Sequence, residues 1–236
     1  MRGAMPSSER GLDAGPARYR VRVSRQGPAG ALTHLAQIEA LRSAVVRSGL
    51  PFVPDGKRKR PRPRISFGPA ISVGYESLAE YFDLELAGPL SPEDIARRLS
   101  GAMEQGFAVQ GLRRIPAFFP SLDASINIVR YEIRGPFPPD CPARLSRLLG
   151  RAEIPIEKIK DGGARIERVD ARPLIREAVL EEPGRLGLTL RFGPKRTVKP
   201  EALLRELLGP EALIEGFLII RRELLSETSS GELMTP

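Results

Sequence analysis

A run of cations separated by prolines has the clearest chemistry in this sequence. It comprises Lys57, Arg58, Lys59, Arg60, Arg62 and Arg64, and a proline precedes each of the last two. Prolines favour an extended chain and oppose a helix. Alternate cations of an extended chain lie at a spacing close to that of phosphates along a nucleic-acid strand, so the run predicts a polyanion contact. The alternative is a solvated surface loop.

The only histidine, His34, is a second candidate. It follows the Gly-Pro-Ala-Gly loop at 27–30 and lies in the first turn of a predicted helix. A helix start behind such a loop can receive an anion, and an imidazole could add a hydrogen bond or a proton. Arg25, just before the loop, is a further anion-binding candidate. A capping or packing role for His34 is the alternative.

Two weaker signals complete the set of candidates. Residues 192–197 loosely resemble a phosphate-facing loop and supply Lys195 and Arg196, although such a string is more often a turn before a helix. Phe118, Phe119 and Tyr75 could stack on bases, with the core as their alternative place. No G-x-G-x-x-G, P-loop or kinase signature is present.

The counts of ligating residues exclude several chemistries. One cysteine, Cys141, and one histidine cannot assemble an iron–sulfur cluster or a structural zinc site, so we expect this chain to bind no metal or cofactor. A single cysteine fits a reducing compartment. The net charge of +8 favours polyanionic partners. Without an apolar leader or a bilayer-spanning run, we expect a cytoplasmic protein with no membrane contact.

Hydrophobic periodicity predicts the order β-α-β-β-α-β for the first half of the chain. The second half repeats the plan with extra strands, and its segment Arg-Tyr-Glu-Ile at 130–133 echoes Arg-Tyr-Arg-Val at 18–21. The predicted strands are 19–23, 65–68, 81–86, 107–115, 126–133, 165–170, 175–180, 186–191 and 217–222, and the predicted helices are 34–48, 91–103, 142–149 and 198–208.

This order predicts an α+β protein of two tandem ferredoxin-like modules (split βαβ, βαββαβ) with antiparallel sheets and helices on one face. We expect the modules at 18–118 and 119–225. The flanking segments 1–17 and 226–236 are polar or rich in glycine and serine, and are expected to be disordered tails.

Several segments together resemble a known bacterial family. They are Tyr-Arg-Val-Arg-Val-Ser-Arg-Gln-Gly-Pro at 19–28, Leu-Thr-His-Leu at 32–35, Ser-Gly-Leu-Pro at 48–51, Arg-Ile-Ser-Phe-Gly-Pro-Ala at 64–70, Val-Gly-Tyr-Glu-Ser-Leu-Ala-Glu-Tyr at 73–81, Pro-Ser-Leu at 120–122 and Arg-Thr-Val-Lys-Pro-Glu at 196–201. The chain resembles the radical SAM-linked proteins, or domain-of-unknown-function family 2344. The family's usual aromatic, Gly, Asn and Pro-His arrangement is replaced by the cationic run.

The resemblance implies a cobalamin-binding radical SAM protein as partner. The iron–sulfur cluster, S-adenosylmethionine and cobalamin would then reside in that partner. The first module also resembles, at the level of fold, the ferredoxin-like RNA endonucleases of CRISPR systems, in which a histidine on the first helix often serves cleavage.

Three functional hypotheses follow. The first is a non-catalytic accessory protein that presents an RNA, such as tRNA or rRNA, to the radical SAM partner. The second is an RNA-processing enzyme with His34 as general acid or base and Arg25, Lys57 or Arg58 steadying a phosphate. The third is a protein–protein adaptor without RNA contact.

Overall fold

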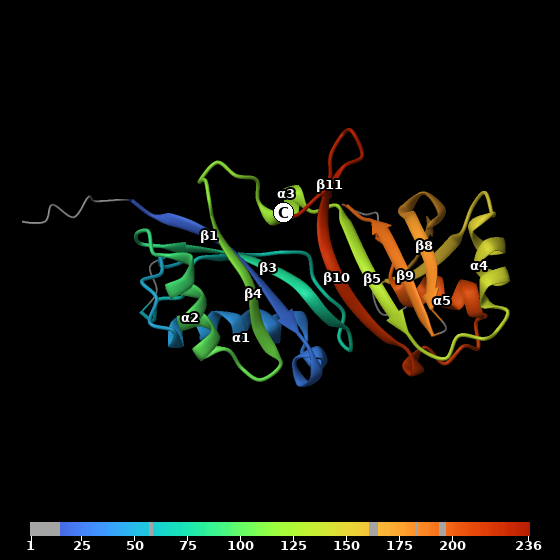
Figure 1. Ribbon diagram of the computed structural model, residues 1–236, viewed down its shortest axis with the longest axis horizontal. Helices are drawn as coiled ribbons and strands as arrows, with labels where there is room; N and C mark the ends of the chain where they lie inside the picture. The colour runs from blue at the N-terminus through green and yellow to red at the C-terminus, as the bar shows by residue number, and fades with distance from the viewer. Residues whose placement is uncertain (1–14, 57–58, 161–164, 183, 194–196) are drawn as a thin grey trace, which may run out of the picture.

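The structure is a computed structural model that describes residues 15–56, 59–160, 165–182, 184–193 and 197–236. Over these residues the chain has a mixed α+β fold with a mostly antiparallel sheet and few helices. Nine strands form one sheet in the order β4-β1-β3-β10-β5-β9-β8, with β2 paired to β3 and β11 to β10. The first half of the chain lies at one end of this sheet and the second half at the other (Figure 1).

Strand β1 (Ala17–Arg25) is central to the first half because it pairs antiparallel with both of its neighbours. Its alternate residues Tyr19, Val21 and Val23 are fully buried, and α1 and α2 supply apolar side chains to the same core. The elements of this half are η1 (Gly27–Ala31), α1 (His34–Arg47), β2 (Ile65–Phe67), β3 (Glu76–Leu86), α2 (Pro92–Ala102) and β4 (Phe107–Ile115).

The second half builds its own core under α4 and α5, where Leu145 and Leu204 pack with inward residues of β5 and β9. Strands β6 and β7 form a separate two-stranded sheet. The elements are α3 (Leu122–Ser125), β5 (Ile128–Arg134), α4 (Cys141–Leu149), β6 (Pro155–Lys160), β7 (Arg165–Asp170), η3 (Arg172–Leu174), β8 (Ile175–Glu182), β9 (Arg185–Arg191), α5 (Pro200–Leu208), η4 (Ile214–Gly216), β10 (Leu218–Glu227) and β11 (Leu233–Met234).

Strand β10 joins the two halves. It pairs parallel with β3 through Ile220↔Glu76 and Arg221↔Ser77, and antiparallel with β5. Strand β3 in turn contributes to both cores, because Phe82, Leu84 and Leu86 pack under α1 and α2 whereas Ala79 and Tyr81 belong to the cluster of the second half. The last long strand of the chain therefore closes a single continuous sheet.

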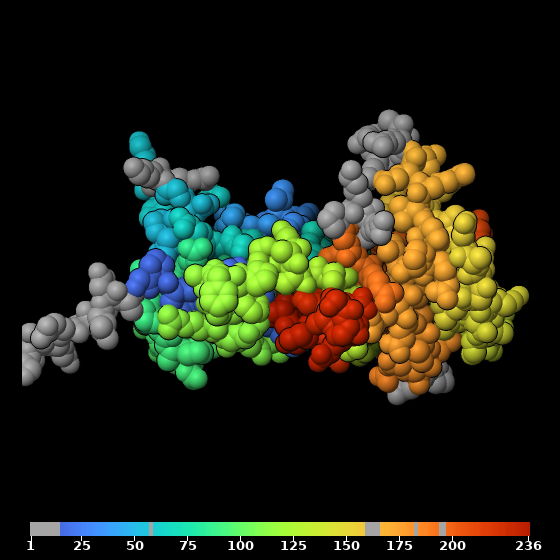
Figure 2. Space-filling view, turned by 90° about the horizontal axis from the view of Figure 1, so that it is seen from above, coloured from blue at the N-terminus to red at the C-terminus, as the bar shows by residue number. Residues whose placement is uncertain are grey.

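The expectation of a disordered C-terminal tail at 226–236 is wrong. Strand β10 continues to Glu227, the chain turns at Gly231 with a φ of +83°, and β11 pairs back onto β10. The Nη2 of Arg113 also donates to the Pro236 carbonyl at 2.8 Å. In Figure 2 the red C-terminal segment packs against the green segment that follows β4. The prediction failed because it took the polar composition of this segment as a sign of disorder. The hairpin is instead stabilised by backbone and tertiary hydrogen bonds rather than by apolar burial.

The other differences are smaller. Strand β3 begins at Glu76 rather than at 81, and β6 was not predicted because its residues alternate with charges. At the N-terminus the predicted tail 1–17 ends in Ala17, the first residue of β1, and residues 1–14 lie outside the described residues. Among the described helices none is long and apolar enough to cross a membrane.

Candidate anion-binding sites

The predicted cationic run lies on a hairpin-like loop at the end of β3. Pro54 and Pro63 form an antiparallel bridge, and the Asp55 N–H donates to the Arg62 carbonyl at 2.7 Å. The base of the loop is anchored to the sheet, since the Val53 N–H donates to the Glu85 carbonyl at 2.8 Å. The cyan segment around residue 60 projects from one end of the molecule (Figure 2). The base of the loop is therefore tied to the sheet on both sides.

The cations of this loop differ in their surroundings. Arg62 pairs with Glu39 at 3.3 Å and Arg64 with Glu85 at 3.2 Å, and the four side chains are 33–53% exposed. Lys59 and Arg60 are exposed, and neither forms an ion pair within the described part of the chain. Lys57 and Arg58 lie outside the described residues. Lys59 and Arg60 thus leave two positive charges open to an anion.

Arg25 lies elsewhere and is fully buried. Its guanidinium donates to the carbonyls of Ala29, Gly30 and Leu32 and to Oε1 of Gln37, at 2.6–3.0 Å. Burial lowers the pKa of Arg25, and nearby Glu80 partly offsets this effect. Nε and Nη2 therefore hold the loop before α1 and Nη1 holds Gln37 within α1, so every nitrogen of the guanidinium is used inside the protein.

His34 is the first residue of α1, as predicted, and is half-buried. The helix start is capped by Thr33, whose Oγ1 accepts from the Ala36 N–H at 3.2 Å. The Nδ1 of His34 is buried and has no hydrogen-bond partner among the described residues. The structure thus brings His34 and Arg25 to the same loop, but not to the cationic hairpin.

Of the remaining predicted residues, Lys195 and Arg196 lie outside the described residues. Phe118 is 89% exposed, whereas the Phe119 ring lies against the guanidinium groups of Arg20 and Arg113, each 5.2 Å from its centroid. Phe119 is therefore engaged in cation–π contacts within the protein. Tyr75 is buried, and its role is described below.

A buried polar network that the sequence reasoning missed connects α1 to β10. Gln37, held by Arg25, donates to Oε2 of Glu80 at 3.1 Å. Oε1 of Glu80 accepts from Arg221, which also donates to the carbonyls of Pro69 and Ala70. Burial works against the charge of Arg221, but Glu80 and Tyr131 outweigh it and hold the pKa above its usual value. The one signal in the sequence was that Arg221 directly follows the apolar residues 217–220 within a predicted strand.

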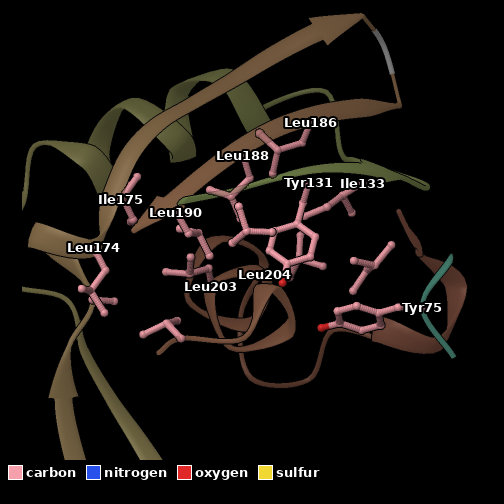
Figure 3. Packing of buried hydrophobic residues seen from close by; sticks show 14 of the residues in the cluster. Tyr75, Tyr131, Ile133, Leu174, Ile175, Leu186, Leu188, Leu190, Leu203 and Leu204 are labelled. Atoms are coloured by element: carbon pink, nitrogen blue, oxygen red, sulfur yellow. The ribbon is translucent and has the colours of Figure 1, made fainter. Parts of the chain in front are cut away.

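Arg221 lines a cavity of about 370 Å³ where the two halves meet. The polar residues around it are Ser72, Tyr75, Tyr131, Thr197, Lys199 and Arg221. The rings of Tyr75 and Tyr131 meet edge to face with centroids 6.1 Å apart. Figure 3 shows their hydroxyl oxygens pointing toward the same region beside Leu203 and Leu204 of α5.

Tyr75 also connects this cavity to α5, because its hydroxyl donates a hydrogen bond to Oε2 of Glu201. Burial, together with this carboxylate, raises the pKa of Tyr75 well above its usual value. The phenol therefore stays protonated and acts as a donor. The cavity as a whole combines apolar walls with a buried cation and two phenols.

These features define a mixed α+β protein with two places suited to anions, one on a projecting loop and one in a cavity. Within the described residues no group of three or more His, Cys, Asp or Glu side chains is placed to hold a metal ion. The chain belongs to the family described as "Uncharacterized protein conserved in bacteria (DUF2344)", whose profile matches residues 18–200. A search of curated proteins found no match.

Proposed function

We propose that this protein is a non-catalytic accessory protein that binds RNA, such as tRNA or rRNA, and presents it to a cobalamin-binding radical SAM partner. The observation that supports RNA binding best is the projecting hairpin with Lys59 and Arg60 exposed and without ion pairs in the described part of the chain. The partner is inferred from the resemblance to the radical SAM-linked proteins.

The geometry of the hairpin suits a nucleic-acid backbone. Its base is tied to β3 by backbone hydrogen bonds, so the described part of the loop that flanks Lys59 and Arg60 is ordered before binding. Exposed cations that neutralise phosphates release condensed counterions, which favours binding at low salt. An irregular loop also suits single-stranded or looped RNA better than the major groove of a duplex, which is too deep and narrow for side chains to read.

The residue composition of the chain supports the proposed accessory role. One cysteine cannot ligate an iron–sulfur cluster, so the radical chemistry of such a pair would belong to the partner. For an RNA-cleaving enzyme, His34 would need a second proton-transfer group. The Nδ1 of His34 has no hydrogen-bond partner among the described residues.

We also propose that each half is a ferredoxin-like module. In the first half, β1 lies between β3 and β4 and is antiparallel to both. Strand β2 pairs with the other side of β3. Helices α1 and α2 pack on one face of this sheet. This is the arrangement expected for a split βαβ unit. The second half departs further, because β10 is shared with β3 of the first half.

RNA binding is tested by changing Lys57, Arg58, Lys59 and Arg60 to Ser and measuring affinity for labelled bacterial RNA at several salt concentrations. We expect weaker binding and a shallower dependence of log K on log salt, by about 0.7 for each phosphate of single-stranded RNA that the variant no longer neutralises. The matched control is Arg97→Ser with Arg98→Ser, which removes two exposed cations that pair with Asp94 on α2.

Unchanged affinity and salt dependence in the hairpin variant would show that the loop is only solvated surface. That outcome would favour the adaptor hypothesis. An equal loss of affinity in the α2 control would show that net charge, rather than the hairpin, governs binding.

A further inference from the structure

The cavity at the junction of the two halves has an unusual charge balance. The buried network that reaches the cavity through Arg221 contains, among the described residues, two guanidinium groups, those of Arg25 and Arg221, and one buried carboxylate, that of Glu80. Glu201, whose carboxylate accepts from Tyr75, is half-exposed. The buried part of the network thus carries one positive charge that no buried carboxylate balances, and such a charge strongly favours a nearby anion.

One hydrogen-bond donor of this network has no acceptor among the described residues of the protein. Arg221 is 4% exposed, and its Nε makes no hydrogen bond within the described residues. The polar group that faces its guanidinium from β5 is the hydroxyl of Tyr131, which also lines the cavity. A neutral phenol can donate as well as accept, so Arg221 and Tyr131 together can serve one anionic group.

The other walls of the cavity are apolar. Val129, Leu190, Phe192 and Leu224 contribute side chains from three neighbouring strands and the segment after β9. Lys199, at the N-cap of the nine-residue helix α5, adds an exposed cation at the rim, and the helix start favours negative charge. A ligand of matching chemistry has an anionic end and a small apolar body.

We propose that this cavity is a binding site for a small organic anion, a carboxylate or a phosphate ester whose charged group meets Arg221 and Tyr131 and whose apolar body lies against Val129, Leu190 and Phe192. The volume of about 370 Å³ accommodates a molecule the size of one aromatic ring with its substituents. This site is distinct from the cationic hairpin and independent of RNA binding.

The chain contains no tryptophan, so a single Phe192→Trp change creates a specific fluorescent reporter on the cavity wall. This variant is titrated with benzoate, phenyl phosphate, the neutral benzyl alcohol and the cation benzamidine. We expect saturable binding of one or both anions, and at least tenfold weaker binding of the neutral and cationic compounds. Comparing benzoate with phenyl phosphate distinguishes a carboxylate ligand from a phosphate ligand. Saturation-transfer NMR on the unchanged protein checks that the reporter did not create the site.

Arg221→Met in the reporter background should weaken anion binding about tenfold or more, as expected for loss of a charged hydrogen-bond partner. The matched control is Arg222→Met, the next residue on β10, which is about half exposed and lies 3.7 Å from Glu132. If Arg221→Met does not fold, two other variants test the site. Lys199→Ala changes the rim and Ser72→Phe fills the cavity, and neither alters the buried network. Both should reduce anion binding.

Binding of benzyl alcohol as tight as that of the anions would overturn the proposal. Anion binding unchanged in a folded Arg221→Met, or in both Lys199→Ala and Ser72→Phe, would also overturn it. The hairpin variant with four serines should bind the anions normally, so failure of RNA binding and failure of this site are observed separately.

Discussion

The Nη1 of Arg221 donates to Oε1 of Glu80 at 3.0 Å, so a buried ion pair joins β10 of the second half to β3 of the first. The other oxygen of Glu80 accepts from Gln37 of α1, which is held by Arg25. Backbone pairing between β3 and β10 is limited to two residue pairs. The side-chain network therefore adds to the connection that this pairing and the packing of Ala79 and Tyr81 make between the two halves.

Glu80→Ala should destabilise the protein by about 3–5 kcal/mol, because it leaves two buried guanidinium groups without a counter-charge. Urea unfolding followed by circular dichroism measures this free energy. Glu132→Ala removes the carboxylate that pairs with exposed Arg134 and Arg222 and should change stability by about 1 kcal/mol or less. Equal losses of stability in the two variants would contradict a special role for the Glu80 network.

The stability of the protein should fall above about pH 10, and Tyr75 should contribute to this fall. Burial and Glu201 raise the pKa of Tyr75, so the folded state keeps a proton that the unfolded state releases near pH 10. The unfolded state then binds fewer protons, and the free energy of unfolding decreases as pH rises. Urea titrations between pH 8 and about 11 should show a shallower decrease for Tyr75→Phe. Parallel curves would contradict this assignment.

Cys141 should be unreactive in the folded protein. It is 1% exposed, and burial, aided by Asp140, raises the pKa of its thiol, so little thiolate forms near neutral pH. Labelling with 5,5′-dithiobis(2-nitrobenzoic acid) should be slow in buffer and reach one thiol per chain in denaturing urea. Fast, complete labelling of the native protein would show that α4 opens readily.

His34→Ala should weaken RNA binding by a factor of a few, corresponding to about 1 kcal/mol for one modest hydrogen bond. Filter binding with labelled RNA measures the change, and Leu35→Ala, which truncates a neighbouring side chain that is 77% exposed, serves as control. Neither protein should cleave RNA without a partner. Specific cleavage by the unchanged protein that disappears in His34→Ala would make the chain a nuclease.

The isolated chain should be colourless and contain no stoichiometric iron, because one cysteine and one histidine cannot form a cluster site. Iron should appear only when the chain is purified in complex with a radical SAM protein. Metal analysis and the visible spectrum check both statements. A visible charge-transfer band in the isolated monomer would contradict the proposed division of labour.

Local pattern predicted most of the individual elements. Strand β4 matches its prediction at 107–115, and α1 and α2 begin where Thr33 and Ser91 supply caps. Period-2 alternation, helical spacing and cap residues are encoded within a few neighbouring positions, so a single sequence reveals them. The same reasoning failed at 226–236, where the ordered structure depends on hydrogen bonds to residues distant in sequence, such as Arg113 and Asn127.

The sequence by itself determined which reactive side chains the chain contains. They are one thiol, one imidazole, and a cluster of cations between prolines that a loop must expose. Only the tertiary structure decided which charges are available. Nothing in the sequence marked Arg25 as buried, and only its place next to the apolar residues 217–220 marked Arg221. Both are buried around Glu80, whereas Arg62 and Arg64 are paired and Lys59 is exposed. The reason is that the electrostatic role of a cation depends on its solvent exposure and on partners far away in the chain, which only the packing of β3 against β10 brings together.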